Sequence, residues 1–204
     1  MIAIVDYGMG NLGSIHNMFK KIGAPSIITA SISDIEQADK LILPGVGAYD
    51  TGMDQLKKRY LIPILEHKVN VLKTPILGIC LGMQLLTQKG EEGDLPGLGW
   101  LNAKTIRFRF NNDSKKLKVP HMGWNTVRVA RASPLFRNMY AESRFYFVHS
   151  FYVQCICEET VLTYTHYGLD FASAVQKDNI FGVQFHPEKS HKFGMKLLEN
   201  YAGM

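Results

Sequence analysis

The spacing of apolar residues changes character about halfway along this chain of 204 residues. In the first half, short apolar runs rich in Val, Ile and Leu alternate with stretches whose apolar residues recur every three or four positions. The runs are typical of strands in a parallel sheet that is covered on both faces, and the stretches are typical of amphipathic helices. The predicted strands lie at 1–6, 26–30, 40–43 and 75–79. The predicted helices lie at 12–22, at 61–71, at 81–88, and from the loop 44–47 through about residue 58.

The second half contains short segments of β-branched and aromatic residues that are separated by turn residues. This pattern predicts hairpins added to the sheet edge or a small second sheet, followed by an amphipathic helix at 189–203. We find no repeat, low-complexity tract or linker, and we therefore expect residues 1–204 to form a single domain. The predicted strands of this half lie at 104–110, 126–129, 145–148, 160–167, 172–176 and 181–184.

The most informative segment is 75–85, where an apolar run ends in Gly78-Ile-Cys-Leu-Gly82 and continues as an amphipathic stretch. This order predicts a strand, a sharp turn and a helix, with the Cys80 thiol at the turn. Side chains at positions 78 and 82 would collide in such a strained turn, so small residues are required there. The following helix offers its positive N-terminal end to a thiolate and its free N–H groups to an oxyanion. The alternative is a buried structural cysteine.

A histidine and a glutamate follow the last predicted strand. Residues 181–188 have the pattern of a buried strand that runs out into a loop carrying His186 and Glu188. A cysteine nucleophile needs a base, and the base needs a group that orients it. Residues two apart on an extended segment point to the same face, so His186 and Glu188 can lie side by side. The alternative, an ordinary solvated loop, is less favoured once the Cys80 turn is considered together with it.

Composition narrows the classes of function. Hydrophobic residues at 46% and charged residues at 20% are typical of a soluble globular protein. No apolar run reaches the roughly 20 residues of a membrane span, and the N-terminus reads as a strand and not as an export leader. The formal charge is +5, but the basic residues are dispersed, and the cluster at 115–118 follows a polar run typical of a solvated hairpin. We therefore expect no nucleic-acid or membrane partner; an acidic protein or a negatively charged substrate is favoured.

The chain contains three cysteines, an odd number for a disulfide framework. Cys155 and Cys157 alternate within an apolar segment, which predicts buried, reduced strand residues. A redox or metal-binding pair is the less favoured alternative. These features fit a reducing cytoplasm.

Motifs from residue 6 to residue 190 resemble those of the class I (triad) glutamine amidotransferases. The turn 78–82 together with His186 and Glu188 carries this match. A narrower resemblance, spanning essentially the whole chain, is to the glutaminase subunits of imidazole glycerol phosphate synthase in histidine biosynthesis. The resemblance implies an α/β fold with a mostly parallel central sheet, flanking helices and added antiparallel hairpins. The segments behind the narrower match are 6–11 (DYGMGN), 43–47 (LPGVG), 119–125 (VPHMGWN), 146–150 (YFVHS) and 182–190 (GVQFHPEKS).

This resemblance implies hydrolysis of L-glutamine to glutamate and ammonia through a cysteine thioester. Cys80 would attack the side-chain amide, and His186 would take the thiol proton and pass it to the departing ammonia. Glu188 would fix the imidazole tautomer. The oxyanion would be bound by the backbone N–H groups of Leu81 and, by resemblance, of Val46.

Gly45 and Gly47 flank the second expected oxyanion donor. Two glycines let the backbone approach the substrate or flip, so the oxyanion hole could stay incomplete until a partner docks. Without the resemblance, the same segment could be a plain helix-initiating turn.

Gln84 lies one helical turn after Cys80 and on the same face, where it can hold the amino or carboxylate end of glutamine. A capping or surface glutamine is the alternative. The resemblance also implies that the backbone of Ser150 and Phe151 binds the α-substituents of glutamine. His149 could be a second base, but a lone histidine in an apolar strand is more often structural.

Ammonia must reach its acceptor through a protein interior, so the face that delivers it should be a docking face. The implied partner is a (β/α)8-barrel synthase subunit that forms a heterodimer and makes imidazole glycerol phosphate and aminoimidazole carboxamide ribotide. No cofactor and no metal are implied. Exposed Trp, Tyr and Met are typical interface anchors, although Trp124 is equally compatible with a core position. The residues that match interface positions are Asn11, Met122, Trp124, Tyr146 and Lys189.

Two other functions remain open. Paralogous subunits supply ammonia to a sugar amidotransferase in surface-polysaccharide biosynthesis, and the basic charge and the segment 97–103 leave this possibility open. A different class is another cysteine hydrolase, or a non-catalytic binding protein, on the same fold. The complete set of Cys80, His186 and Glu188 argues against a non-catalytic protein, and Gln84 with the loop 44–47 favours glutamine over peptides.

Overall fold

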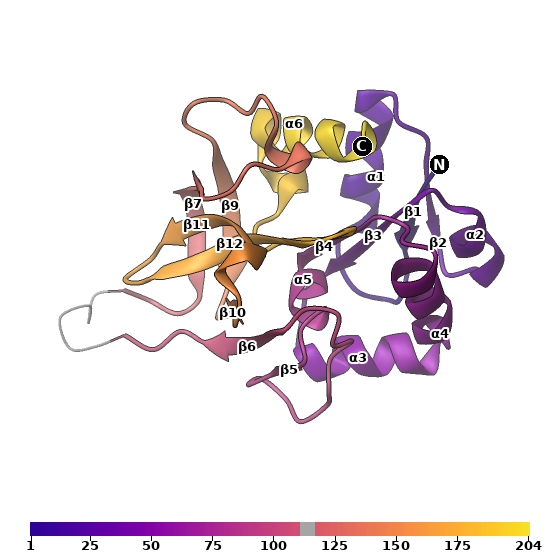
Figure 1. Cartoon of the computed structure of the whole chain (residues 1–204), viewed down its shortest axis with the longest axis horizontal. Coiled ribbons are helices and arrows are strands. Elements are labelled where there is room, and N and C mark those ends of the chain that lie inside the picture. Colours follow the sequence, from indigo (N-terminus) through magenta and orange to yellow (C-terminus); the bar gives the residue numbers. More distant parts are fainter. Residues whose placement is uncertain (111–116) are drawn as a thin grey trace.

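The structure contains a mixed β-sheet, one half of which is parallel and is formed mainly by strands from the first half of the chain. The computed structural model describes residues 1–110 and 117–204 (Figure 1). The strand order β2-β1-β3-β4-β13 joins four early strands to one late strand, and every pair in it is parallel. The alternation of apolar runs with amphipathic stretches therefore predicts this half correctly. The bounds are β1 (Ile2–Val5), β2 (Ser26–Thr29), β3 (Lys40–Gly45), β4 (Ile76–Cys80) and β13 (Ile180–Val183).

Helices cover both faces of the parallel half (Figure 1). Strand β1 shows why: Ile2 and Ile4 pack into the cluster that contains α1 and α6, while Ala3 and Val5 pack into the cluster on the other face. Successive side chains of a strand point to opposite faces, so a strand covered on both sides is apolar throughout. The bounds are α1 (Leu12–Ile22), α2 (Ile32–Gln37), α3 (Tyr49–Lys58), α4 (Leu61–Glu66), continued by a π-helical turn (His67–Val71), α5 (Leu81–Leu85) and α6 (His191–Ala202).

The other half of the sheet is mainly antiparallel. It continues from β13 in the order β12-β10-β6-β5, with β11 pairing β12 and β8, and a separate pair is formed by β7 and β9. The sequence pattern predicts hairpins or a small second sheet, and both occur. The bounds are β5 (Lys89–Gly90), β6 (Ala103–Arg107), β7 (His121–Thr126), β8 (Arg128–Val129), β9 (Arg144–His149), β10 (Phe151–Cys155), β11 (Val161–His166) and β12 (Asp170–Lys177).

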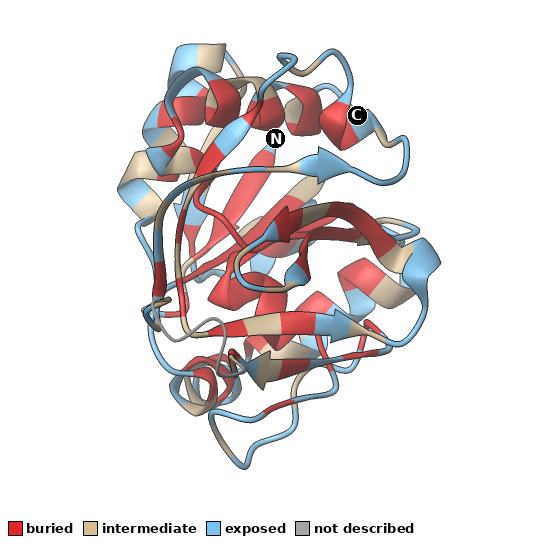
Figure 2. Cartoon of the chain, turned by 90° about the vertical axis from the view of Figure 1, so that its left-hand side faces the viewer, coloured by how far each residue is buried: buried red, intermediate tan, exposed pale blue. Residues whose placement is uncertain are grey.

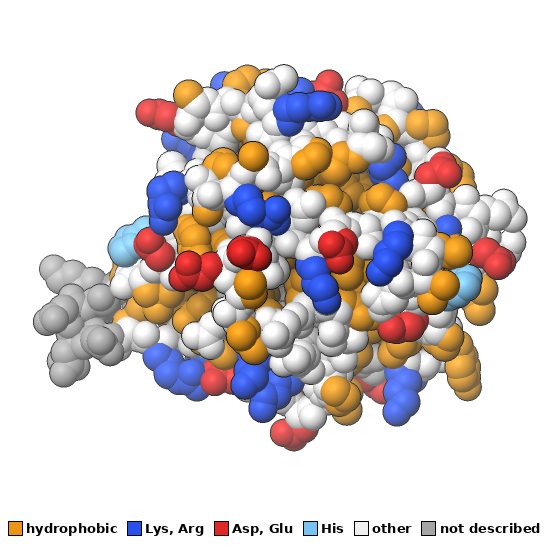
Figure 3. Space-filling model, viewed as in Figure 1, with side chains coloured by type: hydrophobic (Ala, Val, Ile, Leu, Met, Phe, Trp, Pro, Cys, Tyr) orange, Lys and Arg blue, Asp and Glu red, His pale blue; other side chains and the backbone are white. Residues whose placement is uncertain are grey.

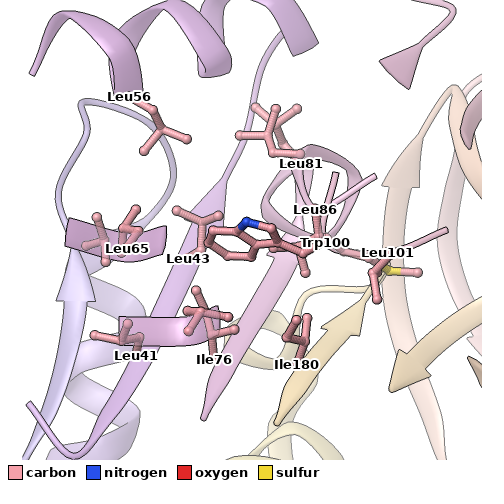
Figure 4. Packing of buried hydrophobic residues seen from close by; sticks show 14 of the residues in the cluster. Leu41, Leu43, Leu56, Leu65, Ile76, Leu81, Leu86, Trp100, Leu101 and Ile180 are labelled. Atoms are coloured by element: carbon pink, nitrogen blue, oxygen red, sulfur yellow. The ribbon is translucent and has the colours of Figure 1, made fainter. Parts of the chain in front are cut away.

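The core lies between the central strands and the helices, as the buried positions in Figure 2 show. One cluster surrounds the indole of Trp100, which is 4% exposed and packs among leucines and isoleucines of β3, β4, β13 and the neighbouring helices (Figure 4). The indole N–H donates to Glu66 Oε2 at 2.9 Å, so its polar atom is satisfied. Burial on both faces holds β4 and β13 in place. The candidate catalytic residues lie at the end of β4 and just beyond the end of β13.

Several predicted boundaries differ from the structure. Helix α2 and strands β5, β7 and β10 are not predicted as separate elements, and α5 ends at Leu85, before the predicted 88. Pro44 and Gly45, predicted as loop, belong to β3. Proline is tolerated there because β1 pairs with β3 only as far as Ile42, so the missing N–H at Pro44 lies beyond that neighbour. The predicted hairpin at 111–118 falls largely on residues 111–116, outside the described residues.

Charged side chains are mixed on the face shown in Figure 3, where Lys and Arg lie among Asp and Glu without forming a single basic stripe. In the described ranges 1–110 and 117–204, no helix combines the length and the apolarity that a membrane span requires.

Candidate active site

Cys80 stands at a strained turn between β4 and α5. Its backbone has φ 54° and ψ −110°, a conformation that non-glycine residues rarely adopt. A Cβ on Gly82 would lie 1.8 Å from the carbonyl oxygen of Leu43, and one on Gly78 would lie 2.7 Å from the backbone nitrogen of Met83. The collisions expected at both glycines are therefore confirmed. The turn presents the thiol above the end of the sheet.

His186 and Glu188 lie just past the end of the neighbouring parallel strand. Strand β13 pairs with β4 in the register Val183 to Ile79, so the residues that follow both strands emerge at one edge of the sheet. The backbone N–H of His186 donates to the carbonyl oxygen of Tyr146 at 2.9 Å, which holds the segment in place. The Nδ1 atom of His186 lies 2.8 Å from Glu188 Oε1, and the two side chains are 1% and 2% exposed. Nε2 therefore remains available for proton transfer.

The surroundings of His186 raise the pKa of its imidazole. Burial alone would lower the pKa of this imidazole, but hydrogen bonds with Cys80 and Glu188 and the charges of both groups raise it to about 10.

This shift predicts a pH-dependent stability. Because the folded-state pKa lies above the ordinary 6.5, the contribution of His186 is fully present below about pH 6.5 and is lost as the pH rises toward 10. We expect urea unfolding between about pH 6 and 10 to show a smaller decline for Glu188→Gln than for wild type, because the glutamine removes one group that favours the proton. Substitution of the exposed Glu142 by glutamine should leave the decline unchanged. Identical declines in wild type and Glu188→Gln would contradict the assignment.

A pocket of about 220 Å³ opens beside the thiol. The structure brings most of the predicted ligand-binding residues together there, although Gly45 is not in the lining. Gly45 instead packs behind the turn, because a Cβ on it would lie 2.5 Å from the Tyr7 hydroxyl and 2.8 Å from Leu81 Cβ. The predicted residues in the lining are Val46, Gly47, Cys80, Leu81, Gln84, Ser150 and Phe151.

Both residues expected to supply the oxyanion donors line this pocket. Leu81 is the first residue of α5 and is buried, whereas Val46 is 46% exposed at the pocket. Gly47 has φ +125°, a conformation that side chains rarely adopt. Val46 is thus followed by a glycine in an unusual backbone conformation. A flip of the peptide at Val46 when a partner binds remains a prediction.

His149 is occupied by structural contacts. Its Nδ1 lies 2.8 Å from the Phe151 carbonyl oxygen and its Nε2 lies 3.0 Å from Nδ1 of His121. Burial lowers the pKa of His149 to about 3, so the ring is neutral at physiological pH. The preference for a structural histidine over a second base therefore agrees with the geometry.

Four pocket residues are not among the predicted ligand-binding residues: Glu92, Pro120, Val148 and His149. Glu92 lies between β5 and β6 and accepts a hydrogen bond from the backbone N–H of Tyr49 at 2.9 Å, at the start of α3. Nothing in the spacing around Glu92 marks it, because it lies in an irregular loop. Val148, in contrast, lies two residues before the predicted Ser150 and could have been found from its neighbours.

Of the predicted interface residues, Met122, Trp124 and Tyr146 lie on the β7–β9 pair and Lys189 lies beside it, whereas Asn11 lies at the start of α1. Trp124 pairs with Tyr146, and Met122 and Trp124 are 62% and 43% exposed, so Trp124 is not a core residue. Lys189 Nζ lies 5.7 Å from the centre of the Tyr146 ring, and the Trp124 ring stacks on His191 at 5.5 Å. Asn11 is exposed and caps α1 by accepting from the Ser14 N–H at 3.4 Å.

The prediction for the remaining cysteines is partly wrong. Cys157 is exposed and Cys155 is only half-buried, because β10 ends at Cys155 and the chain turns away from the sheet. Across the described parts of the chain, no three His, Cys, Asp or Glu side chains are grouped so that they could hold a metal ion.

The chain matches known proteins along its whole length. The model of the family "Glutamine amidotransferase class-I" matches residues 3–202. The chain is 59% identical over 201 residues to "Imidazole glycerol phosphate synthase subunit HisH 2" of Methanococcus maripaludis, and 48% identical over 201 residues to the protein of the same name in Pseudomonas aeruginosa, covering 98% of each chain in both cases.

Solved structures share the fold at low sequence identity. A structure described as a glutamine amidotransferase superposes with a TM-score of 0.76 at 18% identity and full coverage of both chains. A glutamine amidotransferase from Thermotoga maritima gives a TM-score of 0.67 at 17% identity, covering 99% of this chain and 82% of that one. Together with the family match over nearly every residue, these likenesses establish that the chain belongs to the class I glutamine amidotransferase family.

Proposed function

We propose that residues 1–204 act as one glutaminase domain in which Cys80, His186 and Glu188 form the catalytic triad. The observation that carries this proposal is the placement of a thiol on a strained turn next to a buried His–Glu pair, at one edge of two adjacent parallel strands. Other cysteine hydrolases could share a thiol and an imidazole. Family membership favours glutamine as the substrate.

The reaction follows from these positions. The Cys80 sulfur attacks the side-chain amide carbon of glutamine, and His186 carries the proton that the thiol gives up. The backbone N–H groups of Leu81 and Val46 would stabilise the oxyanion. When the C–N bond breaks, His186 gives its proton to the leaving ammonia, which leaves a glutamyl thioester. Water then hydrolyses the thioester to glutamate and regenerates the thiol, with Glu188 holding the imidazole in orientation.

Substrate recognition would come from residues that line the pocket outside the triad. The backbone of Ser150 and Phe151 and the amide of Gln84 line it. Gly47, with φ +125°, lets the loop approach the substrate closely. A steady-state assay of glutamate and ammonia release from L-glutamine, with D-glutamine and asparagine as controls, tests both the reaction and the fit of the pocket. Turnover of asparagine at the rate of L-glutamine would contradict this recognition.

We further propose that the ammonia goes to a (β/α)8-barrel synthase subunit in the cytoplasm. The names of the relatives support a role as the glutaminase subunit of imidazole glycerol phosphate synthase, which serves histidine biosynthesis. The exposed Met122 and Trp124 beside Tyr146 and Lys189 offer a docking surface that Pro120 and Val148 connect to the pocket.

Truncation of the exposed tryptophan should weaken this docking. We expect Trp124→Ala to lower the affinity for the barrel subunit about 10- to 100-fold, the range of an interface hot spot. The melting temperature of the isolated chain should change little, because the side chain is 43% exposed. Tyr60→Ala is a matched control, since Tyr60 is 77% exposed at the start of α4, away from the β7–β9 pair. Titration calorimetry with the barrel subunit measures the effect, and equal affinities for both variants would contradict the surface assignment.

The alternative acceptor of the ammonia is a sugar amidotransferase of surface-polysaccharide biosynthesis. The numbered names of the relatives, HisH 2 in two organisms and HisH 1 in Campylobacter jejuni, indicate more than one such subunit in one organism. Glutamine-dependent product formation, measured side by side with the histidine-pathway barrel and with the sugar-pathway synthase of the source organism, distinguishes the two acceptors. Activity with the sugar synthase alone would favour the paralogue.

A further inference from the structure

Two buried histidines, His121 and His149, take no part in the reaction described above. They are 3% and 5% exposed, and Nδ1 of His121 lies 3.0 Å from Nε2 of His149. Both belong to the β7–β9 pair, where they are cross-strand partners. A buried polar group destabilises the fold unless it forms a hydrogen bond. One of these two ring nitrogens must therefore carry a hydrogen and the other must accept it.

The neighbouring groups fix that arrangement. The carbonyl oxygen of Phe151 can only accept, so Nδ1 of His149 carries the hydrogen that spans 2.8 Å, and Nε2 of the neutral ring accepts from His121. Nε2 of His121 then accepts from Nδ2 of Asn125 at 3.3 Å. The amide of Asn125 agrees with this direction, because its Oδ1 accepts from the Thr126 N–H at 2.8 Å. Both histidines are thus held as the Nδ1–H tautomer.

The Phe151 carbonyl oxygen also accepts from Gln84. Nε2 of Gln84 lies 3.1 Å from this oxygen and 3.1 Å from Oε1 of Gln184, and Gln84 is 5% exposed. Both amide hydrogens of Gln84 are thereby committed. The group that Gln84 presents to the pocket is its amide oxygen, which recognises a donor such as an α-ammonium group and not a carboxylate.

Gln184 completes the connection to the nucleophile. Because its Oε1 accepts from Gln84, its Nε2 is the atom that faces Cys80, at 3.8 Å from the sulfur. Gln184 is fully buried, and its backbone N–H is bound to the Ser173 carbonyl oxygen at 2.9 Å. A buried amide donor held in this way restricts the position of the sulfur and can donate to it as negative charge develops during the reaction.

We propose that His149 and Gln184 are positioning residues of the glutaminase reaction: His149 orients the Phe151 carbonyl in the pocket wall, and Gln184 holds the Cys80 sulfur. They are connected through Gln84, and the network continues through His121 to Asn125 on β7. This inference rests on the proposed glutaminase function. The buried side chains of His149 and Gln184 thereby have a function in the reaction that the triad alone does not give them.

The first test replaces the amide of Gln184 with an apolar side chain of similar length, which removes both the donor to Cys80 and the acceptor for Gln84. In Gln184→Met, we expect alkylation of Cys80 by iodoacetamide at pH 7 to slow about 10-fold and kcat for glutamine to fall about 10- to 100-fold, as for loss of a hydrogen bond to a charged group. Mass spectrometry separates Cys80 from Cys155 and Cys157. Gln176→Met is the control, because Gln176 bonds Ser133 and Asp178 away from the pocket. A folded Gln184→Met with unchanged alkylation of Cys80 would overturn the assignment.

The second test compares two replacements of His149. Asparagine places an amide nitrogen near the position of Nδ1 and can still donate to Phe151, whereas phenylalanine cannot. We expect His149→Phe to raise KM for glutamine about 10-fold with a smaller change in kcat, and His149→Asn to recover most of the loss. Equal KM values for the two variants at similar melting temperatures would indicate a role in packing alone.

A third measurement needs no variant, and so stays decisive if the substituted proteins fail to fold. Long-range ¹H–¹⁵N spectra of the wild-type chain report which ring nitrogen is protonated. We expect both His121 and His149 as neutral Nδ1–H tautomers at pH 7, and an Nε2–H tautomer at either position would refute the network. Because alkylation and spectra use neither glutamine nor a partner, their failure is distinct from failure of the proposed function, which would appear as absent ammonia release by the wild type.

Discussion

Replacement of Cys80 by alanine should reduce glutamine hydrolysis by about 10⁴-fold or more, because loss of a nucleophile removes the covalent pathway altogether. Synthesis from added ammonium salt by the complex with the barrel subunit should continue, since that route bypasses the thiol. Alanine keeps the strained backbone at φ 54° and removes only the sulfur, so the fold and the docking surface should persist. Coupled assays with glutamine and with ammonium sulfate as alternative nitrogen sources measure the two rates.

The matched control for this variant is Cys157→Ala. Cys157 is exposed beyond the end of β10 and lies outside the pocket lining, so its removal should leave both rates at the wild-type level. If glutamine-dependent synthesis survived in Cys80→Ala, the assignment of the nucleophile would fail. If the ammonium-dependent rate fell together with the glutamine-dependent rate, the variant would have lost its partner and not only its sulfur.

The elements that can be predicted from the sequence are those whose local residue pattern agrees with the way they are buried in the fold. Strand β4 and the turn at Cys80 can be predicted because an apolar run must be buried on both faces and because Gly78 and Gly82 leave room for the helix. Helix α1 can be predicted because Ile15, Met18 and Phe19 form one buried stripe that ends at Gly23, where φ is 78°.

The missed elements lack such a signal. Helix α2 has six residues, of which only Ile35 is buried, so it is too short to show a helical period. In β7, His121 is buried and the strand then alternates between exposed and half-buried residues, including Gly123. Within residues 1–110 and 117–204, β9 is its one partner strand. A strand of this kind is stabilised by its partner and not by its own composition, which is why sequence pattern alone does not identify it.

The three residues proposed as a triad can be selected from motifs, but the network around them cannot. Cys80 and Gln184 are 104 positions apart, and Gln84 and Gln184 are 100 apart, so only the parallel pairing of β4 with β13 brings them together. Each glutamine by itself is an ordinary polar residue in an apolar stretch. A glutamine that is fully buried needs bonding partners, and this physical requirement marks Gln184 once its burial is known.

Introduction of a single methyl group at Gly82 should be among the most damaging small changes in this chain. The added Cβ would lie 1.8 Å from the Leu43 carbonyl oxygen and 2.8 Å from the Leu43 carbonyl carbon, so β3 and α5 would have to separate. Both atoms belong to the backbone of a central strand and cannot rotate away. We expect Gly82→Ala to lower the free energy of unfolding by about 3–5 kcal/mol, the upper range for an overpacked site.

Gly13→Ala is the matched control for this prediction. Gly13 lies in helix α1, and no neighbouring atom lies within 4 Å of the place that an alanine methyl group would take there. Alanine at this position should therefore raise the free energy of unfolding by about 0.5–1 kcal/mol through its better helix propensity. Urea titrations of the three proteins measure the differences. Equal stability of Gly82→Ala and wild type would contradict this prediction. It would mean that β3 and α5 can separate without a loss of stability, so that their close contact at Gly82 does not fix the position of the Cys80 sulfur. If instead the variant folds with reduced stability, its glutaminase rate should fall as well, because the N–H of Leu81 moves together with the helix that follows the turn.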